Sequence, residues 1–279
     1  MFGDVISQHG DWIWLGSLIE SLAPFGYSER LVRTSVFRLV EDDWLQVKKV
    51  GRKSYYTLTS LATNHNKKAA RRIYAESITT INREWLLVIP SFVTEPKSTQ
   101  FKKQLTWLGF STITTSLFAH PSIERESLDE TIRELELEDK VIVFSSRTID
   151  KHSSKVLKRL VFEKWDLQSL QLKYDSFIDS YQSIYQRLNT GQTISHQQSY
   201  LIRILLIHEY RRILLKDHEL STNMLPDDWS GFVANQLVKN LYQLLNTNSE
   251  NYILGNLRAI NGFLPISNID SKQRFKSRE

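Results

Sequence analysis

Cysteine is absent from the 279 residues of the sequence. Disulfide bonds, thiolate catalysis and cysteine-ligated zinc are therefore excluded, and the composition suits a reducing cytoplasm. The first residues lack the basic start and the apolar run of a signal peptide. The longest apolar runs, such as 86–89 and 204–207, fall far short of the about 20 residues that span a bilayer. We predict a cytoplasmic protein that has no membrane partner.

The patterns that usually carry catalysis are also missing. The seven histidines show none of the spacings that are typical of a zinc site. The sequence contains no G-x-S-x-G nucleophile motif, no P-loop and no dinucleotide-binding glycine pattern. We therefore predict no catalytic residue, no metal site, no cofactor and no enzymatic activity.

Positive charge is present in excess and gathers in the first quarter of the chain. The formal net charge is +5, and residues 1–75 carry eleven Lys or Arg against seven Asp or Glu. A local positive field is typical of a module that binds a polyanion, although an ordinary solvated surface can give the same count. The charge therefore indicates nucleic acid only if the fold of this region fits that partner.

The order of predicted elements in this region is that of a winged helix. A helix at 11–21 and a turn precede a second helix from Glu29 to about Asp42, which Ser28 caps. Two strands at 45–50 and 54–58 follow and are joined by a basic turn. The second helix of such a module enters the major groove, and the tip of the hairpin contacts phosphates.

The side chains that would face DNA are mostly basic or carry a hydroxyl group. Arg offers paired hydrogen bonds to guanine, and Ser or Thr can contact bases or phosphates. Ordinary structural roles are the alternative, because Arg38 can pair with Asp42 and Lys48 can be a solvated strand residue. We predict DNA contacts at Ser28, Arg30, Arg33, Thr34, Ser35, Arg38, Lys48, Arg52, Lys53 and Tyr55.

The rest of the chain divides into an α+β part and a helical part. Strands at 85–90, 112–119 and 141–144 alternate with helices at 98–108, 128–137 and 153–165, as in a small ferredoxin-like α+β sandwich. Helical patterns continue at 167–188, 197–215, 230–245 and 250–260. The predicted fold class is α+β, with a winged-helix domain at 1–75, an α+β middle domain at 76–165, a helical C-terminal domain at 166–266 and a disordered tail at 267–279.

Several short motifs resemble a known family. They are Phe2-Gly3-Asp4, Trp14–Leu18, Val32–Leu39, Gly51–Tyr56, Leu105–Phe110, Trp165–Leu167 and the stretch Tyr210–Gly231, which begins with Tyr-Arg-Arg. In this order they are similar to the PaaX family of phenylacetate-degradation repressors, and the resemblance covers nearly the whole chain. The chain begins at the Phe-Gly-Asp motif, which family members usually precede with a helical segment.

The resemblance implies a repressor of a catabolic operon that binds a pseudo-palindromic, double-stranded operator as a homodimer. It also implies that phenylacetyl-coenzyme A, or a related aryl-acyl-coenzyme A, acts as the inducer and releases the DNA. The middle domain is expected to have a Cas2-like fold. Nuclease activity in that fold depends on an aspartate at the end of the first strand, and residues 85–91 supply none.

An inducer that carries coenzyme A needs positive groups for its phosphates and an apolar slot for its acyl end. The predicted ligand-binding residues are Tyr210, Arg211, Arg212 and Trp229. The alternative is that the two arginines pair with Asp217, Asp227 or Asp228 and stabilise the fold.

A protein–protein adaptor with a degenerate winged helix is the alternative function. An adaptor face is expected to present apolar hot spots. The predicted face instead carries Arg33, Thr34 and Arg38 beside the basic turn with Arg52 and Lys53. The sequence therefore favours DNA as the partner.

Overall fold

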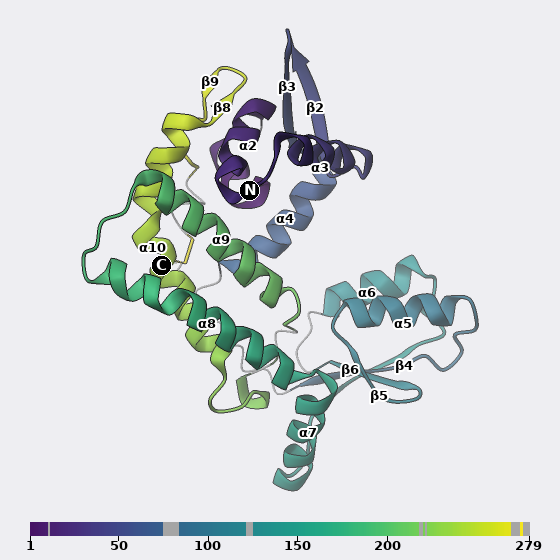
Figure 1. Cartoon of the computed structure of the whole chain (residues 1–279). Helices are drawn as coiled ribbons and strands as arrows, with labels where there is room; N and C mark the ends of the chain where they lie inside the picture. The colour runs from purple at the N-terminus through teal and green to yellow at the C-terminus, as the bar shows by residue number, and fades with distance from the viewer. Residues whose placement is uncertain are drawn as a thin grey trace. The chain divides into compact units, whose positions relative to one another are not determined.

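The computed structural model of the chain describes residues 1–10, 12–74, 84–120, 125–217, 220, 222–268 and 274–275, without the side chains of Lys68 and Arg71 (Figure 1). Contacts group the chain into two compact units. The first consists of Met1–Ser77, Ser176–Leu214 and Val233–Glu279, and the second of Ile78–Asp175 with Leu215–Phe232. The grouping differs from the consecutive domains predicted from sequence, because the N-terminal stretch shares a unit with C-terminal helices. The boundary predicted near residue 75 lies outside the described residues.

The N-terminal part of the first unit is a winged helix. Its elements, in chain order, are η1 (Phe2–Ile6), α1 (Ser7–His9), β1 (Ile13–Trp14), α2 (Leu15–Leu22), η2 (Ala23–Phe25), α3 (Glu29–Glu41), β2 (Leu45–Val50), β3 (Lys53–Leu58) and α4 (Ser60–Ile73). The three strands form an antiparallel sheet in the order β1-β3-β2. The predicted order of helix, turn, helix and hairpin is therefore confirmed.

Local side-chain chemistry sets the ends of these elements. The hydroxyl of Ser28 accepts a hydrogen bond from the Leu31 amide (3.3 Å) and caps α3. Gly51 has φ +59° in the turn between β2 and β3, a conformation that favours glycine. Val32 and Val36 are buried on α3, whereas Leu31 is 49% exposed. The helix therefore buries a narrower stripe of side chains than its apolar residues indicate.

The core of the winged helix is completed by helices from the other end of the chain. These are α9 (His196–Leu214) and α10 (Ser230–Asn256), which is followed by a short hairpin of β8 (Arg258–Ala259) and β9 (Gly262–Phe263). Tyr200, Ile204 and Ile253 belong to the same buried cluster as Val32 and Val36. The sequence predicted two helices at 230–245 and 250–260 where the structure has one.

The predicted tail at 267–279 is not disordered where the structure describes it. Phe275 is 1% exposed and packs edge-on against Tyr74, with ring centroids 5.3 Å apart. The amide of Asn268 donates a hydrogen bond to the carbonyl of Gln8 (2.8 Å). The prediction of disorder, which rested on the polar composition of the tail, is therefore wrong for these residues. Basic and aromatic side chains of the tail pack inside the first unit.

The second unit contains a four-stranded antiparallel sheet in the order β5-β6-β4-β7. Its elements are β4 (Trp85–Ile89), α5 (Lys97–Trp107), β5 (Ser111–Thr114), β6 (Leu117–His120), α6 (Arg125–Glu134), β7 (Ile142–Ser146) and α7 (Lys151–Lys164). The single strand predicted at 112–119 is thus a hairpin. This β-α-β-β-α-β order is ferredoxin-like, as predicted, and the fold class is α+β.

Helices α5 and α6 cover one face of this sheet. Val88, Phe101 and Leu128 are fully buried between the sheet and the helices. Trp165, at the end of α7, donates its Nε1 hydrogen to the carbonyl of Gly109 (3.0 Å). The long helix α8 (Leu167–Asn189) begins in the second unit and ends in the first. Among the described helices, none is long and apolar enough to cross a membrane.

Candidate nucleic-acid interface and adjoining pocket

The outward face of α3 is basic. Arg30, Thr34 and Arg38 follow one another at intervals of four residues and are all exposed. Because an α-helix turns once in about 3.6 residues, this spacing places them along one ridge. Val32 and Val36 anchor the opposite side of the helix in the core. The structure therefore presents the three side chains on a continuous exposed strip.

Two contacts within α3 order its exposed side chains. The Nε and Nη2 atoms of Arg33 lie 2.8 and 2.7 Å from Oε1 of Glu29, four residues earlier. Exposed pairs of this kind contribute little to stability, so Arg33 can exchange Glu29 for another acceptor. The hydroxyl of Thr34 donates to the carbonyl of Arg30 (2.9 Å). The pairing of Arg38 with Asp42, given above as the alternative to a DNA contact, is not found among the described contacts.

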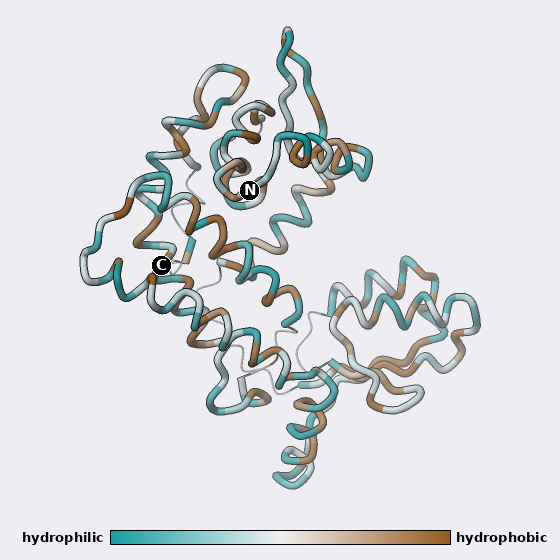
Figure 2. Tube along the Cα trace, viewed as in Figure 1, coloured by the Kyte–Doolittle hydropathy of each residue, from teal (hydrophilic) through white to brown (hydrophobic). Residues whose placement is uncertain are grey.

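The wing adds a second basic surface. Lys48, Arg52 and Lys53 are exposed on the β2–β3 hairpin, and Figure 2 shows hydrophilic residues at its tip. The ammonium group of Lys53 lies 4.7 Å from the ring centroid of Trp14. α3 packs against β2 within the same unit, so the two basic surfaces adjoin. A recognition helix beside a basic hairpin tip is an arrangement suited to the DNA backbone and major groove.

Two of the predicted DNA contacts have a structural role. Tyr55 is 5% exposed, because β3 is the central strand and this side chain faces the core. The prediction of a DNA contact at Tyr55 is therefore wrong for this conformation. Ser28 is exposed, but its hydroxyl already caps α3. Ser35 is exposed on α3 beside the ridge.

A buried charged cluster lies behind the winged helix, and it was not predicted from sequence. Asp4 of η1 is 6% exposed, and its Oδ1 lies 2.7 Å from Nη1 of Arg274. Its Oδ2 lies 3.5 Å from Nε of Arg203 on α9, whose side chain is 1% exposed. The hydroxyl of Tyr74, just after α4, also donates to Asp4. One carboxylate therefore joins the N-terminal segment, the end of α4, α9 and the C-terminal segment.

Further polar contacts extend this cluster along α10. Nη1 of Arg203 donates to Oε1 of Glu250 (2.7 Å), and Oε2 of Glu250 lies 3.2 Å from Nε2 of His9. Arg274 also donates to the hydroxyl of Tyr242 (2.9 Å). Burial alone would raise the pKa of Glu250, but its contacts with His9 and Arg203 lower it to about 2. The carboxylate of Glu250 is therefore held in its charged form.

The electrostatics of Asp4 and Tyr74 follow from the same contacts. Burial raises the pKa of Asp4, yet the positive charges of Arg203 and Arg274 outweigh it and lower the pKa below its usual value. Burial, and then the charge of Asp4, raise the pKa of Tyr74 well above its usual value. Asp4 thus stays ionised and Tyr74 stays protonated, as the hydrogen bond between them requires.

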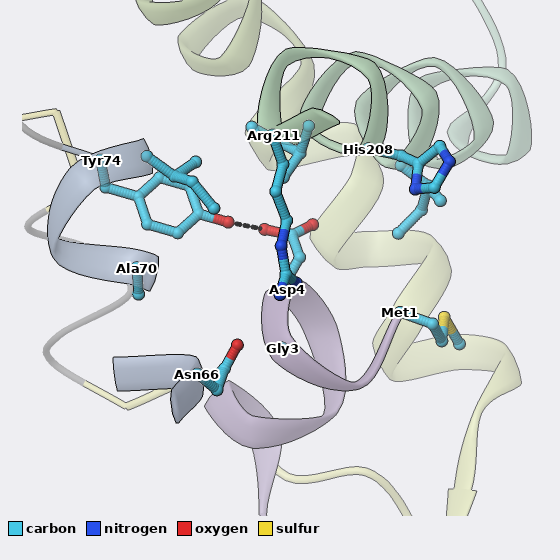
Figure 3. Close-up of a pocket in the computed structure, with 11 residues that line it drawn as sticks. Met1, Gly3, Asp4, Asn66, Ala70, Tyr74, His208 and Arg211 are labelled. Atoms are coloured by element: carbon cyan, nitrogen blue, oxygen red, sulfur yellow. Dashed lines mark hydrogen bonds between the residues drawn. The ribbon is translucent and has the colours of Figure 1, made fainter. Parts of the chain in front are cut away.

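A small pocket opens beside this cluster. The pocket is lined by Gly3 and Asp4 of η1, Asn66 of α4, Tyr74, and His208 and Arg211 of α9, which Figure 3 labels. Its free volume is about 60 Å³, which is room for a few water molecules or one small anionic group. Burial, together with nearby positive charges, lowers the pKa of His208. Arg211 therefore supplies the cationic side chain of α9 in this pocket.

The four predicted ligand-binding residues are not brought together. Tyr210 is fully buried, and its hydroxyl accepts a hydrogen bond from Asn235 (3.0 Å). Trp229 is 2% exposed, packs against Tyr174 and belongs to the other unit. Arg211 lines the pocket, whereas Arg212 is exposed. Of the four, only Arg211 faces the described pocket in this conformation.

One of the predicted aspartate partners of these arginines has a different contact. Asp217 accepts a hydrogen bond from the hydroxyl of Tyr174 (2.7 Å). Tyr174 is fully buried and Asp217 is 7% exposed. The contact ties the residues after α9 to α8 inside the second unit.

One residue of the buried charged cluster could have been recognised from the sequence. Arg203 lies between Tyr200 and Ile207 at helical spacing, on a face of α9 that is otherwise apolar. A charged side chain on a buried face requires a partner of opposite charge. The identity of that partner could not be read from the sequence, because Asp4 is 199 residues away and Arg274 was assigned to a disordered tail.

Fold and surface together define a winged-helix protein of the kind that binds DNA, joined to a ferredoxin-like domain. Family models match in the same order: PaaX-like protein at residues 1–62, the PaaX protein central Cas2-like domain at 79–157 and the PaaX-like protein C-terminal domain at 165–255. Transcriptional repressor PaaX of Escherichia coli (strain K12) is 34% identical over 244 residues, which are 87% of this chain and 77% of that protein. The chain belongs to the PaaX family.

Family membership supports a role as a transcriptional repressor, and the family is one of repressors rather than enzymes. A solved structure of an uncharacterized protein, Rv0674 from Mycobacterium tuberculosis, is similar with a TM-score of 0.53. The alignment covers 85% of this chain and 90% of that one at 16% identity, so it supports the fold alone.

Proposed function

We propose that the protein is a homodimeric repressor of an aromatic-acid, phenylacetate-type catabolic operon, and that an aryl-acyl-coenzyme A releases it from its operator. The observation that carries the DNA-binding part is the exposed ridge of Arg30, Thr34 and Arg38 on α3 beside the basic hairpin. DNA supplies acceptors to this ridge through guanine edges in the major groove and through phosphates. Phenylacetyl-coenzyme A is the first inducer to test.

The proposed inducer contact is Arg211. A guanidinium group binds carboxylate and phosphate well, and Arg211 lines a pocket between η1, α4 and α9. The pocket of about 60 Å³ holds one anionic group and not a whole coenzyme A thioester. The remainder of the inducer must lie outside the pocket as described, or the pocket must widen when the inducer binds.

The deciding experiment is a titration of fluorescent promoter DNA from a phenylacetate catabolic operon with the full chain, with and without phenylacetyl-coenzyme A. The proposal expects tight binding that the thioester reverses and that free phenylacetate and free coenzyme A leave intact. Binding that no thioester affects would retain the DNA-binding part and remove the proposed inducer. Absence of specific binding at moderate salt would remove the repressor proposal itself.

Arg33 and Arg52 are expected to differ in kind. Arg33→Ala should weaken binding to the operator by about 10- to 100-fold, the loss typical of a paired contact to guanine. It should weaken binding to random-sequence DNA much less. Arg52→Ala should weaken binding to operator and to random-sequence DNA alike. It should also reduce the slope of the logarithm of the binding constant against the logarithm of the salt concentration by about one unit. Fluorescence anisotropy at several salt concentrations measures both effects.

Glu29→Gln is the matched control for Arg33, because it removes the carboxylate that Arg33 contacts and leaves the arginine in place. Its operator affinity should stay at or above that of the unsubstituted protein. Equal losses on operator and random DNA for Arg33→Ala would show that Arg33 contacts the backbone and reads no base.

The proposed dimer surface is the exposed part of the sheet face opposite α5 and α6 in the second unit, here called the open sheet face. Trp85 lies on the same face but is buried against Trp165. Val143 packs into the core with α5, so the alternating side chains of Ile142 and Phe144 face the opposite side, where they are 45% and 48% exposed. An exposed apolar sheet face is typical of a protein interface, and two-fold pairing of it matches a palindromic operator. Phe144→Asp is therefore expected to convert the dimer to monomer at micromolar concentration, as measured by analytical ultracentrifugation.

Trp107→Asp is the control for this surface, since Trp107 is 74% exposed at the end of α5, the helix on the covered side of the sheet. It should leave the dimer intact. A Phe144→Asp protein that sediments as a dimer would exclude the open sheet face as the interface.

The adaptor remains a second candidate because of one observation. α3 exposes apolar side chains among its arginines: Phe37 is 61% exposed and Leu31 49%. Exposed aromatic residues flanked by arginine are common in protein–protein hot spots. The promoter titration separates the two functions, since an adaptor shows no preference for operator over random DNA.

A further inference from the structure

Phe37 is an unusual side chain for a surface that meets a polyanion. It is 61% exposed on α3, in the unit that carries the basic wing. Each residue advances about 100° around a helix, so Phe37 lies on the outward side with Thr34 and Arg30, three and seven residues earlier. A large aromatic ring in this position is solvated in the free protein and gains by being covered.

The surroundings of Phe37 indicate what covers it. Arg30, Arg33 and Arg38 carry positive charge on the same exposed part of α3, and Arg52 extends the charge on the wing. A partner that covers this face must therefore combine negative charge with an apolar group at the centre of the contact. Double-stranded DNA does so where a thymine presents its C5 methyl group in the major groove.

Thr34 strengthens this argument. Its hydroxyl proton is donated to the carbonyl of Arg30 (2.9 Å) and is not available to a base. Thr34 can therefore offer DNA its methyl group or a lone pair, but no hydrogen. The centre of the exposed face of α3 thus contains the ring of Phe37 and a threonine without a free donor, bordered by arginines.

We propose that Phe37 reads thymine by packing on its methyl group, so that one part of operator specificity is apolar while the arginines supply the hydrogen-bonded part. This inference rests on the proposed DNA-binding function and adds a residue that was absent from the contacts predicted from sequence. Its distinguishing consequence is sensitivity to a methyl group that carries neither charge nor hydrogen bonds.

The test replaces single thymines by uracil across the operator segment that footprinting defines. Uracil keeps every hydrogen-bonding group of thymine and removes only the methyl group. Affinity of the full chain is measured by fluorescence anisotropy for the unsubstituted protein, Phe37→Ala and Leu31→Ala. Leu31 is the matched control, because it is 49% exposed on α3 but six residues from Phe37 and turned to another side.

The expected result is that at least one thymine-to-uracil change in each half-site weakens binding by about fourfold, the effect of burying one methyl group. Phe37→Ala should bind thymine and uracil operators equally at that position, and Leu31→Ala should retain the difference. Operator binding without sensitivity to any uracil, or sensitivity that persists in Phe37→Ala, would overturn the role of Phe37 and leave the repressor proposal standing. Failure to bind any operator would overturn both.

Discussion

Asp4→Ala is expected to lower the free energy of unfolding by about 3–5 kcal/mol, the range observed when one partner of a buried ion pair is removed. The reason lies in the burial of the partners, since the side chains of Arg203 and Arg274 are 1% and 5% exposed. Without the Asp4 carboxylate, the acceptors that remain to Arg274 among the described residues are neutral, the Tyr242 hydroxyl and backbone carbonyls, in an environment that solvates its charge poorly. Urea or guanidinium unfolding, monitored by tryptophan fluorescence, measures the change.

Two comparisons separate this effect from a general loss of packing. Asp129→Ala removes a carboxylate that is 42% exposed and pairs with Arg125 on α6, and it should cost less than about 1 kcal/mol. The double variant Asp4→Ala with Arg274→Ala should be less destabilised than the sum of the single variants, because it no longer buries the unpaired arginine. An Asp4→Ala change as small as that of Asp129→Ala would mean that the buried cluster does not hold the unit together.

The aspartate of the family's Phe-Gly-Asp motif, Asp4, thus has a structural role. Asp4 connects η1 to α9 and to the C-terminal segment, and Tyr74 adds the end of the helix that follows the wing. The winged helix is therefore fixed to C-terminal elements by charge as well as by the shared apolar core. This is why contacts place it in one unit with α9 and α10.

Local patterns were sufficient to predict the winged helix from the sequence. The Ser28 cap, the valines of α3 and the basic turn at Gly51 act over a few residues, so their outcome depends little on the rest of the chain. The alternation of strands and helices in the middle domain likewise indicated its ferredoxin-like fold, although the hairpin of β5 and β6 was predicted as one strand. The exposed contacts on α3 could be placed from helical spacing alone.

Long-range pairing explains most of what the sequence did not reveal. The sequence predicted a break at 246–249 between two helices. In the structure α10 continues through it, and Ser249 and Glu250 accept hydrogen bonds from Arg203. The sequence predicted Tyr55 on the surface of the wing, but its side chain is buried on the central strand β3, whose position could not be read from local pattern. Such errors arise where a polar or amphipathic side chain is satisfied by a partner far away in the sequence.

The Tyr-Arg-Arg motif illustrates the same limit at the candidate inducer site. Sequence grouped Tyr210, Arg211 and Arg212 as one ligand-binding element. In a helix, neighbours point about 100° apart, so adjacent residues seldom share a surface. Tyr210 is accordingly in the core, Arg211 faces the pocket and Arg212 faces solvent.

Because Arg211 faces the pocket and Arg212 faces solvent, substitutions of the two are expected to affect the inducer response differently. Arg211→Ala should weaken the response to phenylacetyl-coenzyme A by about 10- to 100-fold, as expected for the loss of hydrogen bonds from a charged group to an anion. Operator affinity without inducer should be unchanged, because Arg211 belongs to α9 and not to the α3 ridge or the wing. The measurement is the concentration of thioester that releases half of the fluorescent operator.

Arg212→Ala is the matched control, with the same chemical change on the same helix, one residue further along. If it leaves the release curve unchanged while Arg211→Ala shifts it, the loss must come from the pocket and not from the net charge of α9. Because coupling between inducer and operator is reciprocal, a saturating operator should also weaken thioester binding in the unsubstituted protein by the factor by which the thioester weakens operator binding. Release curves that coincide for all three proteins would place the inducer elsewhere, and a shift caused by Arg212→Ala alone would place it on the exposed side of α9.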